Sequence, residues 1–161
     1  MSTSSPVALA LGSNLGDRLA HLNWAVERLG RILTDVRASS FIETEPVDVP
    51  DAQPPYLNGA VVGKTVLEPR KLLEALLAIE RERGRERLAV RAARTLDLDL
   101  ILYGDRIANE PGLVIPHPRF RERRFVLEPL AEIAGEWIDP ATGKTIQALA
   151  RQLSNFKEPS P

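Results

Sequence analysis

The sequence predicts an α+β fold in which helices pack on a largely antiparallel, ferredoxin-like sheet. Apolar runs of strand length and stripes of helical spacing follow one another without the regular alternation that a parallel sheet requires. A length of 161 residues, with 43% hydrophobic and 27% charged residues, suits one domain with an ordinary buried core. We therefore expect residues 1–161 to form a single domain, with flexible ends at 1–6 and 154–161.

The N-terminal part of the chain predicts a strand followed by a helix. Residues 7–11 are a short apolar run, typical of a buried strand, and the turn-forming sequence Gly-Ser-Asn-Leu-Gly-Asp occupies 12–17. Apolar residues at helical spacing then form one stripe, which ends before Gly30, a suitable C-terminal cap. The members of this stripe are Leu19, Leu22, Val26 and Leu29.

The next part predicts two strands separated by a proline-containing loop. β-Branched and aromatic residues at 32–44 favour an extended strand, and residues 56–66 predict another. Between them, residues 45–55 contain several prolines and are too long for a simple connection. Loops of this length are often binding loops.

A second helix is predicted from Pro69 to about Arg83. Proline fits the first turn of a helix, and Gly84 is a suitable end. The apolar face of this helix would hold Leu72, Leu76 and Ile79. After a basic loop, residues 95–103 alternate as in a strand, and a turn, a Pro-His-Pro segment and two short helices complete the chain.

The composition excludes several classes of site. The chain has no cysteine, which excludes disulfides, iron–sulfur clusters and thiolate zinc sites, and having only two histidines disfavours a multi-histidine metal site. A metal would be bound mainly by oxygen, as magnesium, manganese and calcium are. The net charge of −1 and the lack of a long apolar stretch or a secretory leader favour a cytoplasmic protein that binds neither nucleic acid nor membrane.

The strand at 95–103 carries a pair of aspartates. A period of two places its leucines on one face and Asp97 and Asp99 on the other. The leucines are Leu96, Leu98, Leu100 and Leu102. Two carboxylates whose α-carbons lie about 7 Å apart along a strand can converge on one hard cation, or hold two that bridge a polyphosphate. The alternative is that both aspartates face water, although aspartate is a poor strand former.

Arginines gather on both sides of this strand. The upstream group consists of Arg81, Arg83, Arg85, Arg87, Arg91 and Arg94, and the downstream group of Arg119, Arg121, Arg123 and Arg124. Guanidinium groups bind phosphate oxygens bidentately, so arginines beside a carboxylate-bound cation indicate magnesium-dependent phosphate transfer from a nucleotide. We favour a solvated helix face for Arg81 and Arg83 and a functional role for Arg94. His117 could donate to a phosphate or be an ordinary loop residue.

Six short motifs follow one another along about residues 8–153. They are Gly-Ser-Asn-Leu-Gly-Asp at 12–17, Ser-Ser-Phe at 39–41, Tyr-Leu-Asn at 56–58, Arg-Thr-Leu-Asp-Leu-Asp at 94–99, Pro-His-Pro at 116–118 and Arg-Phe-Val-Leu at 124–127. In this order they resemble the 6-hydroxymethyl-7,8-dihydropterin pyrophosphokinase family of folate biosynthesis. The resemblance implies a ferredoxin-like fold and the transfer of the β,γ-diphosphate of ATP to the hydroxymethyl oxygen of the pterin, which releases AMP.

The resemblance also implies a role for each matched residue. Asp97 and Asp99 would bind two magnesium ions, and Arg85 and Arg94 would assist the transfer. The residues that would contact ATP are Glu80, Arg87, Leu100 (through its backbone), His117 and Arg123. Those that would form the pterin pocket are Thr44, Val47, Tyr56, Asn58 and Phe125.

The residue types suit a flat, polar heterocycle, although other interpretations exist. Tyr56 and Phe125 offer aromatic faces and Asn58 offers an amide, but both aromatics could simply pack in the core. A ferredoxin-like sheet with arginine clusters is also compatible with an RNA- or nucleotide-binding module without catalysis. A further alternative is an ATP-using enzyme that acts on another heterocycle. We expect a monomer or a weak homodimer.

Overall fold

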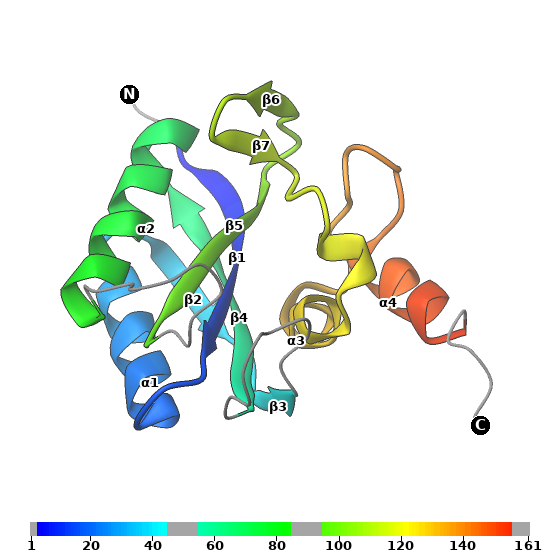
Figure 1. The fold of residues 1–161 in the computed structure, drawn as a ribbon. Coiled ribbons are helices and arrows are strands. Elements are labelled where there is room, and N and C mark those ends of the chain that lie inside the picture. Colours follow the sequence, from blue (N-terminus) through cyan, green and yellow to red (C-terminus); the bar gives the residue numbers. More distant parts are fainter. Residues whose placement is uncertain (1–2, 45–54, 85–94, 156–161) are drawn as a thin grey trace.

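The structure is a computed structural model that describes residues 3–44, 55–84 and 95–155. Its centre is a five-stranded antiparallel sheet in the order β2–β4–β1–β5, with β3 also paired to β4 (Figure 1). The strands are β1 (Ser5–Ser13), β2 (Thr34–Ala38), β3 (Ile42–Thr44), β4 (Tyr56–Thr65) and β5 (Asp97–Tyr103). A separate hairpin is formed by β6 (Ala108–Glu110) and β7 (Leu113–Ile115).

Helices cover both faces of the sheet (Figure 1). They are α1 (Arg18–Leu29), α2 (Pro69–Arg83), α3 (Arg124–Ala134) and α4 (Ile146–Asn155), with a short 3₁₀ turn, η1 (Phe120–Glu122), before α3. The α1 and α2 helices lie on one face, and α3 and α4 lie on the other. The order of strands and of the first two helices is that of a ferredoxin-like fold, so the predicted fold class is confirmed.

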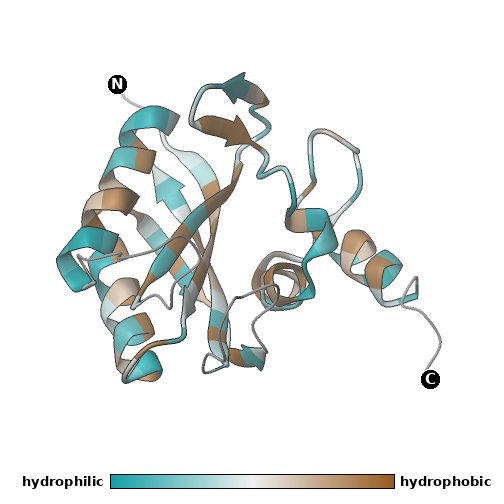
Figure 2. Ribbon diagram, in the orientation of Figure 1, coloured by the Kyte–Doolittle hydropathy of each residue, from teal (hydrophilic) through white to brown (hydrophobic). Residues whose placement is uncertain are grey.

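The central strand β1 is buried on both faces. Val7, Leu9 and Leu11 pack under α1 and α2, whereas Ala8 and Ala10 pack under α3 and α4. This explains why residues 7–11 form a continuous apolar run rather than an alternating one. Figure 2 shows hydrophobic residues along β7 and most of β5, and a mixture of hydrophobic and hydrophilic residues along α2.

The predicted helices agree with the structure except at one position. The α2 helix has the predicted bounds, and its apolar face is fully buried. In α1, by contrast, Leu19 is exposed, so its place in the apolar stripe is wrong. The buried face consists of Leu22, Ala25 and Leu29, which lie in the later turns, where the helix packs on the sheet.

The single strand predicted at 32–44 is divided into β2 and β3, which lie end to end along one edge of β4. The division occurs at the Ser-Ser-Phe motif. The hydroxyl of Ser39 accepts the backbone N–H of Ala60 at 2.9 Å, and so replaces a backbone acceptor. Phe41 lies against Gly59, where any side chain would collide with its ring. This close approach requires glycine at 59.

The strand that carries the aspartates contains a β-bulge. Leu9 of β1 pairs with Leu100, but the preceding residue, Ala8, pairs with Leu102, which leaves Ile101 as an extra residue on β5. Leu98 and Leu100 therefore pack under α1 and α2, as predicted, whereas Leu102 packs on the opposite face. The prediction of one leucine face is wrong at Leu102, because an extra residue reverses the direction of every later side chain.

Parts of both chain ends belong to regular elements. The β1 strand begins at Ser5 and α4 ends at Asn155, while residues 1–2 and 156–161 lie outside the described residues. The predicted loop at 45–55 also lies outside them, except for Pro55. In the described part of the chain, no helix is long and apolar enough to cross a membrane.

A buried carboxylate fixes the segment between α3 and α4. Asp139 has no exposed side-chain surface and accepts hydrogen bonds from Arg121 at 2.6 and 3.0 Å. It also accepts from the Thr142 hydroxyl at 2.8 Å and from the Ala141 backbone at 3.0 Å. Burial by itself would raise the pKa of Asp139, but these hydrogen bonds outweigh it and hold the pKa below its ordinary value.

We predict that Asp139→Asn lowers the free energy of unfolding by on the order of 3 kcal/mol at neutral pH, because it leaves Arg121 without its charged partner. A carboxyl group whose pKa is depressed by folding stabilises the protein above its unfolded pKa, and this contribution is lost as the pH falls through the folded pKa. The difference between wild type and variant in urea unfolding should therefore shrink under acid conditions. A difference that stays constant from neutral to acid pH would contradict the account.

Candidate active site

The aspartates of β5 and an asparagine of β4 flank a strip of small residues on one face of the sheet. In the strand register, Asp97 pairs with Gly12 of β1, and Gly12 pairs in turn with Asn58 of β4. A second row, one pleat further along, is formed by Asp99, Ala10 and Ala60. With neighbouring strands about 4.8 Å apart, the α-carbons of Asp97 and Asn58 are separated by roughly 10 Å. The space between them is spanned by a residue without a side chain.

Three of the residues predicted for the pterin pocket lie together at the β4 side of this strip. Asn58 is buried, and its Nδ2 donates to the Thr44 hydroxyl at 2.6 Å. Thr44 pairs with Tyr56, which lies on the same face as Asn58 because the two are separated by one residue. A Cβ at Gly12 would approach Asn58 Oδ1 to 3.0 Å and the Tyr56 ring to 3.5 Å. Glycine at this position therefore keeps the arrangement open.

His117 lies beside the aspartates. Its backbone N–H donates to the carbonyl oxygen of Ile101 at 3.0 Å, and its Nδ1 accepts from the backbone of Arg119 at 3.2 Å. Burial lowers the pKa of His117, and Arg123 lowers it further, while Asp97 acts in the opposite direction. The imidazole is therefore neutral at pH 7. Because Nδ1 accepts a hydrogen bond, the proton is assigned to Nε2, which can act as a donor.

Arg123 and Phe125 lie next to each other at the start of α3. Phe125 lies in the first turn of α3 and packs against the core cluster under this helix. The guanidinium of Arg123 lies 5.7 Å from the centroid of its ring. Arg123 also interacts electrostatically with His117. A cation suited to phosphate and a ring suited to stacking are thus placed next to each other.

Glu80 supports the strand from the opposite side. It is a buried residue of α2, and its Oε2 accepts the backbone N–H of Leu98 at 2.7 Å. Leu98 lies between the two aspartates, so this bond fixes the backbone that carries them. Leu100, whose backbone was expected to contact ATP, lies next on the same strand, with its side chain in the core under α1 and α2.

Some predicted residues lie outside the described part of the chain. They are Val47, Arg85, Arg87 and Arg94. Gly84 and Thr95, the described residues on either side of 85–94, lie close together, since a side chain at Gly84 would collide with Thr95.

The oxygen donors of the site suit a hard cation. Asp97 and Asp99 are partly buried carboxylates on one face of a strand. Within residues 3–44, 55–84 and 95–155, no group of three or more histidine, cysteine, aspartate or glutamate side chains is placed to hold a metal. Magnesium is commonly bound by one or two carboxylates together with phosphate oxygens and water, so the pair fits this ion.

Several residues that join the elements around the site had no predicted role. Ser40 donates from its hydroxyl to Glu132 of α3 at 2.7 Å, which ties the strand region around 39–41 to this helix. Arg18 joins α1 to Glu43 and Pro55. The motif at 39–41 was visible in the sequence, but its role was not. Arg18 belongs to no sequence pattern, because its partners are distant in the sequence.

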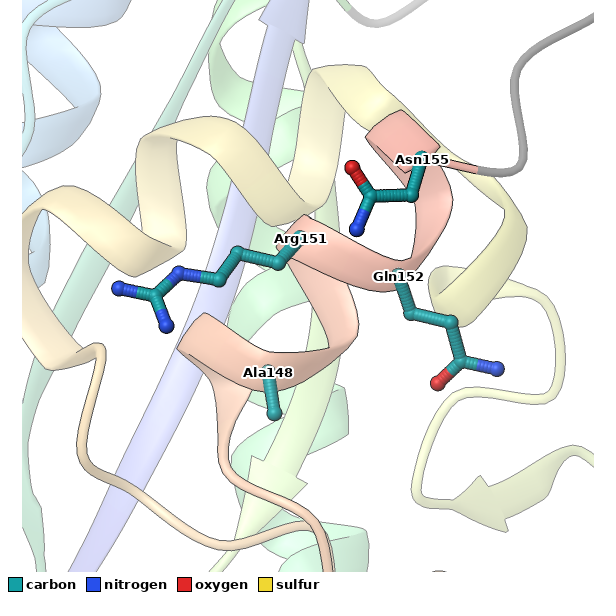
Figure 3. Close-up of a pocket in the computed structure, with 4 residues that line it drawn as sticks. All are labelled: Ala148, Arg151, Gln152 and Asn155. Atoms are coloured by element: carbon teal, nitrogen blue, oxygen red, sulfur yellow. The ribbon is translucent and has the colours of Figure 1, made fainter.

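A hollow on α4 does not coincide with the site. It is lined by Ala148, Arg151, Gln152 and Asn155, all on the exposed face of this helix (Figure 3). None of the predicted site residues belongs to this lining.

A ferredoxin-like sheet with paired carboxylates on an edge strand, beside a neutral histidine and an arginine, is suited to an enzyme that transfers phosphate groups. Comparison with known proteins gives the particular family. The chain belongs to the 7,8-dihydro-6-hydroxymethylpterin-pyrophosphokinase (HPPK) family, whose model matches residues 8–135. The resemblance inferred from the six motifs is thereby confirmed.

Individual relatives agree with this family. The chain is 46% identical to the 2-amino-4-hydroxy-6-hydroxymethyldihydropteridine pyrophosphokinase of Synechocystis over 90% of its own length and 74% of the relative. It is 39% identical to a folic acid synthesis protein of Pneumocystis carinii, but it spans only 20% of that longer chain. The wild-type HPPK-DHPS structure of Plasmodium falciparum has the same fold, with a TM-score of 0.74 at 15% identity over 94% of this chain and 45% of that one.

We predict that Glu80→Ala lowers the free energy of unfolding by about 1–3 kcal/mol, because the buried N–H of Leu98 loses its acceptor. Glu80→Gln keeps an acceptor oxygen and should retain most of this stability. Thermal and urea unfolding of the two variants measure the effect. Equal losses in both would show that the charge of Glu80, and not its bond to Leu98, is what stabilises the strand.

Proposed function

We propose that this chain transfers the β,γ-diphosphate of ATP to the hydroxymethyl oxygen of 6-hydroxymethyl-7,8-dihydropterin, giving AMP and the pterin diphosphate in folate biosynthesis. The observation that carries this proposal is the row Asp97–Gly12–Asn58 across three strands. In this row the β4 side, with Asn58, is suited to a heterocycle, and the β5 side, with Asp97, is suited to a cation and phosphates. Membership of the pyrophosphokinase family supports the same reaction.

The β4 side of the row would hold the pterin. Asn58 presents an amide, Tyr56 and Phe125 present rings, and Thr44 holds the amide of Asn58 in place. A flat heterocycle with a hydrogen-bonding edge is recognised by such a combination of stacking and amide contacts. Val47 is proposed for the same pocket from the resemblance alone.

The β5 side would bind the polyphosphate. Neutral His117 can donate from Nε2 to a phosphate oxygen, and Arg123 supplies a bidentate donor beside it. Leu100 (through its backbone) and Glu80 are proposed as further ATP contacts from the resemblance alone, although Glu80 lies on the α2 side of the strand and accepts from Leu98. Arg87 is proposed as another ATP contact, and Arg85 and Arg94 as the arginines that stabilise charge during transfer. These last three arginines are proposed from the resemblance and from the chemistry of guanidinium groups.

Asp97 and Asp99 would hold magnesium, with two ions expected. When bound, magnesium neutralises phosphate charge and orients the transferred group. The chain's own contribution is to place both carboxylates on one face of β5, opposite Asn58. A monomeric or weakly dimeric state and a cytoplasmic location are part of the same proposal.

Product analysis tests the reaction. The protein is mixed with ATP, magnesium and 6-hydroxymethyl-7,8-dihydropterin, and the products are followed by phosphorus NMR and chromatography. We expect AMP and pterin diphosphate to form together, and only with magnesium. ADP in place of AMP would contradict diphosphate transfer. ATP consumption without change of the pterin would contradict the proposed acceptor.

We predict that Asp97→Asn or Asp99→Asn lowers kcat by on the order of 10²–10³-fold or more, because the cation loses a charged ligand. The fold should be retained, since both side chains are only partly buried. Asp105→Asn, the same change at an exposed turn outside the site, serves as the control. Near-normal turnover in either site variant would overturn the metal assignment.

A further inference from the structure

Arg18, the first residue of α1, joins two segments that are distant in the sequence. Its Nη1 donates to the carbonyl oxygen of Pro55 at 2.8 Å, and its Nη2 donates to Glu43 Oε2 at 2.6 Å. A planar guanidinium can make both bonds at once, whereas a single ammonium group is poorly suited to do so. The start of the helix is itself fixed, because Asp17 Oδ1 accepts the backbone N–H of Ala20 at 3.1 Å.

The two partners of Arg18 stand directly before two residues of the proposed pterin pocket. Glu43 precedes Thr44, and Pro55 precedes Tyr56, which is the pairing partner of Thr44 across β3 and β4. Successive side chains of a strand point to opposite faces. Glu43 therefore reaches Arg18 on the α1 face, while Thr44 points to the other face and accepts from Asn58.

The strand that Arg18 holds is short. The β3 strand has only three residues and, within the described residues, pairs with β4 alone, so its own ladder fixes it weakly. Surface ion pairs contribute little to global stability, and Glu43 is largely exposed. The main consequence of the Arg18 contacts is therefore local: they fix the end of β3 relative to the beginning of β4.

We propose that Arg18 is a positioning residue for the pterin side of the site. Its guanidinium holds Glu43 and Pro55 together, and so sets the separation of Thr44 and Tyr56 and the orientation of the Asn58 amide. It acts from the opposite face of the sheet, through the backbone. This inference rests on the proposed function and assigns a residue that determines the affinity for the pterin rather than for ATP.

The test is a comparison of steady-state parameters for Arg18→Ala and Arg18→Lys with the wild type. Both variants should raise KM for the pterin by about fivefold or more, since small displacements of positioning groups weaken binding strongly. KM for ATP should stay within about twofold, because the residues on the phosphate side do not depend on this contact. Arg18→Lys should restore little of the pterin affinity, because lysine keeps the charge but cannot make both hydrogen bonds of the guanidinium.

The chain offers a matched control in Arg70. Its Nη2 also donates to a glutamate, Glu110 at 2.8 Å, and to a proline carbonyl, Pro111 at 3.3 Å, but it joins α2 to the β6–β7 hairpin. Arg70→Ala should leave both KM values and kcat unchanged. The thermal stability of Arg18→Ala should fall no further than that of Arg70→Ala.

A double-mutant cycle tests whether the effect passes through Glu43. Glu43→Gln should raise KM for the pterin, and the double variant Arg18→Ala/Glu43→Gln should be no worse than Arg18→Ala alone. An unchanged pterin KM in Arg18→Ala, equal shifts for both substrates, or the same shift in Arg70→Ala would overturn the proposal. If the wild type forms no pterin diphosphate, both the proposed function and the positioning role fail. If the wild type is active and Arg18→Ala is normal, only the positioning role fails.

Discussion

The antiparallel pairing of β1 with β4 on one edge and β5 on the other is the constraint on which the site depends. This register places Gly12 between Asn58 and Asp97, and Ala10 between Ala60 and Asp99. Both faces of β1 are buried, so a slip of one residue would exchange its two sets of side chains between unlike cores. The same pairing therefore stabilises the fold and separates the heterocycle side from the phosphate side.

The β-bulge at Ile101 shows how this constraint shapes the edge strand. Before the bulge, Leu98 and Leu100 face α2 and the aspartates face the other way. After it, Leu102 has joined the opposite core, and Tyr103 has returned under α2, where its hydroxyl donates to the carbonyl oxygen of Leu67 at 2.5 Å. Glu80 adds a bond from α2 to Leu98, so the short stretch with both aspartates is held from two directions.

Features that depend on neighbouring residues were predictable from the sequence. The bounds of α2 follow from Pro69 and Gly84, and the common face of Asp97 and Asp99 follows from strand alternation. The face of the sheet on which Leu102 lies was not predictable, because the pairing of β5 with β1 decides it. The break at Ser39 was hidden as well, since a serine hydroxyl replaces a backbone acceptor there. The contacts of Arg18 span 25 and 37 positions and left no local pattern.

The position of the bound cation is the most direct test of the roles of Asp97 and Asp99. Crystals grown with manganese in place of magnesium, a non-hydrolysable ATP analogue and the pterin would reveal manganese by its anomalous scattering. We predict that the carboxylates of both Asp97 and Asp99 bind manganese, with the pterin ring beside Asn58 across Gly12. Manganese held by phosphates and water alone, or a pterin on the α1 and α2 face of the sheet, would contradict it.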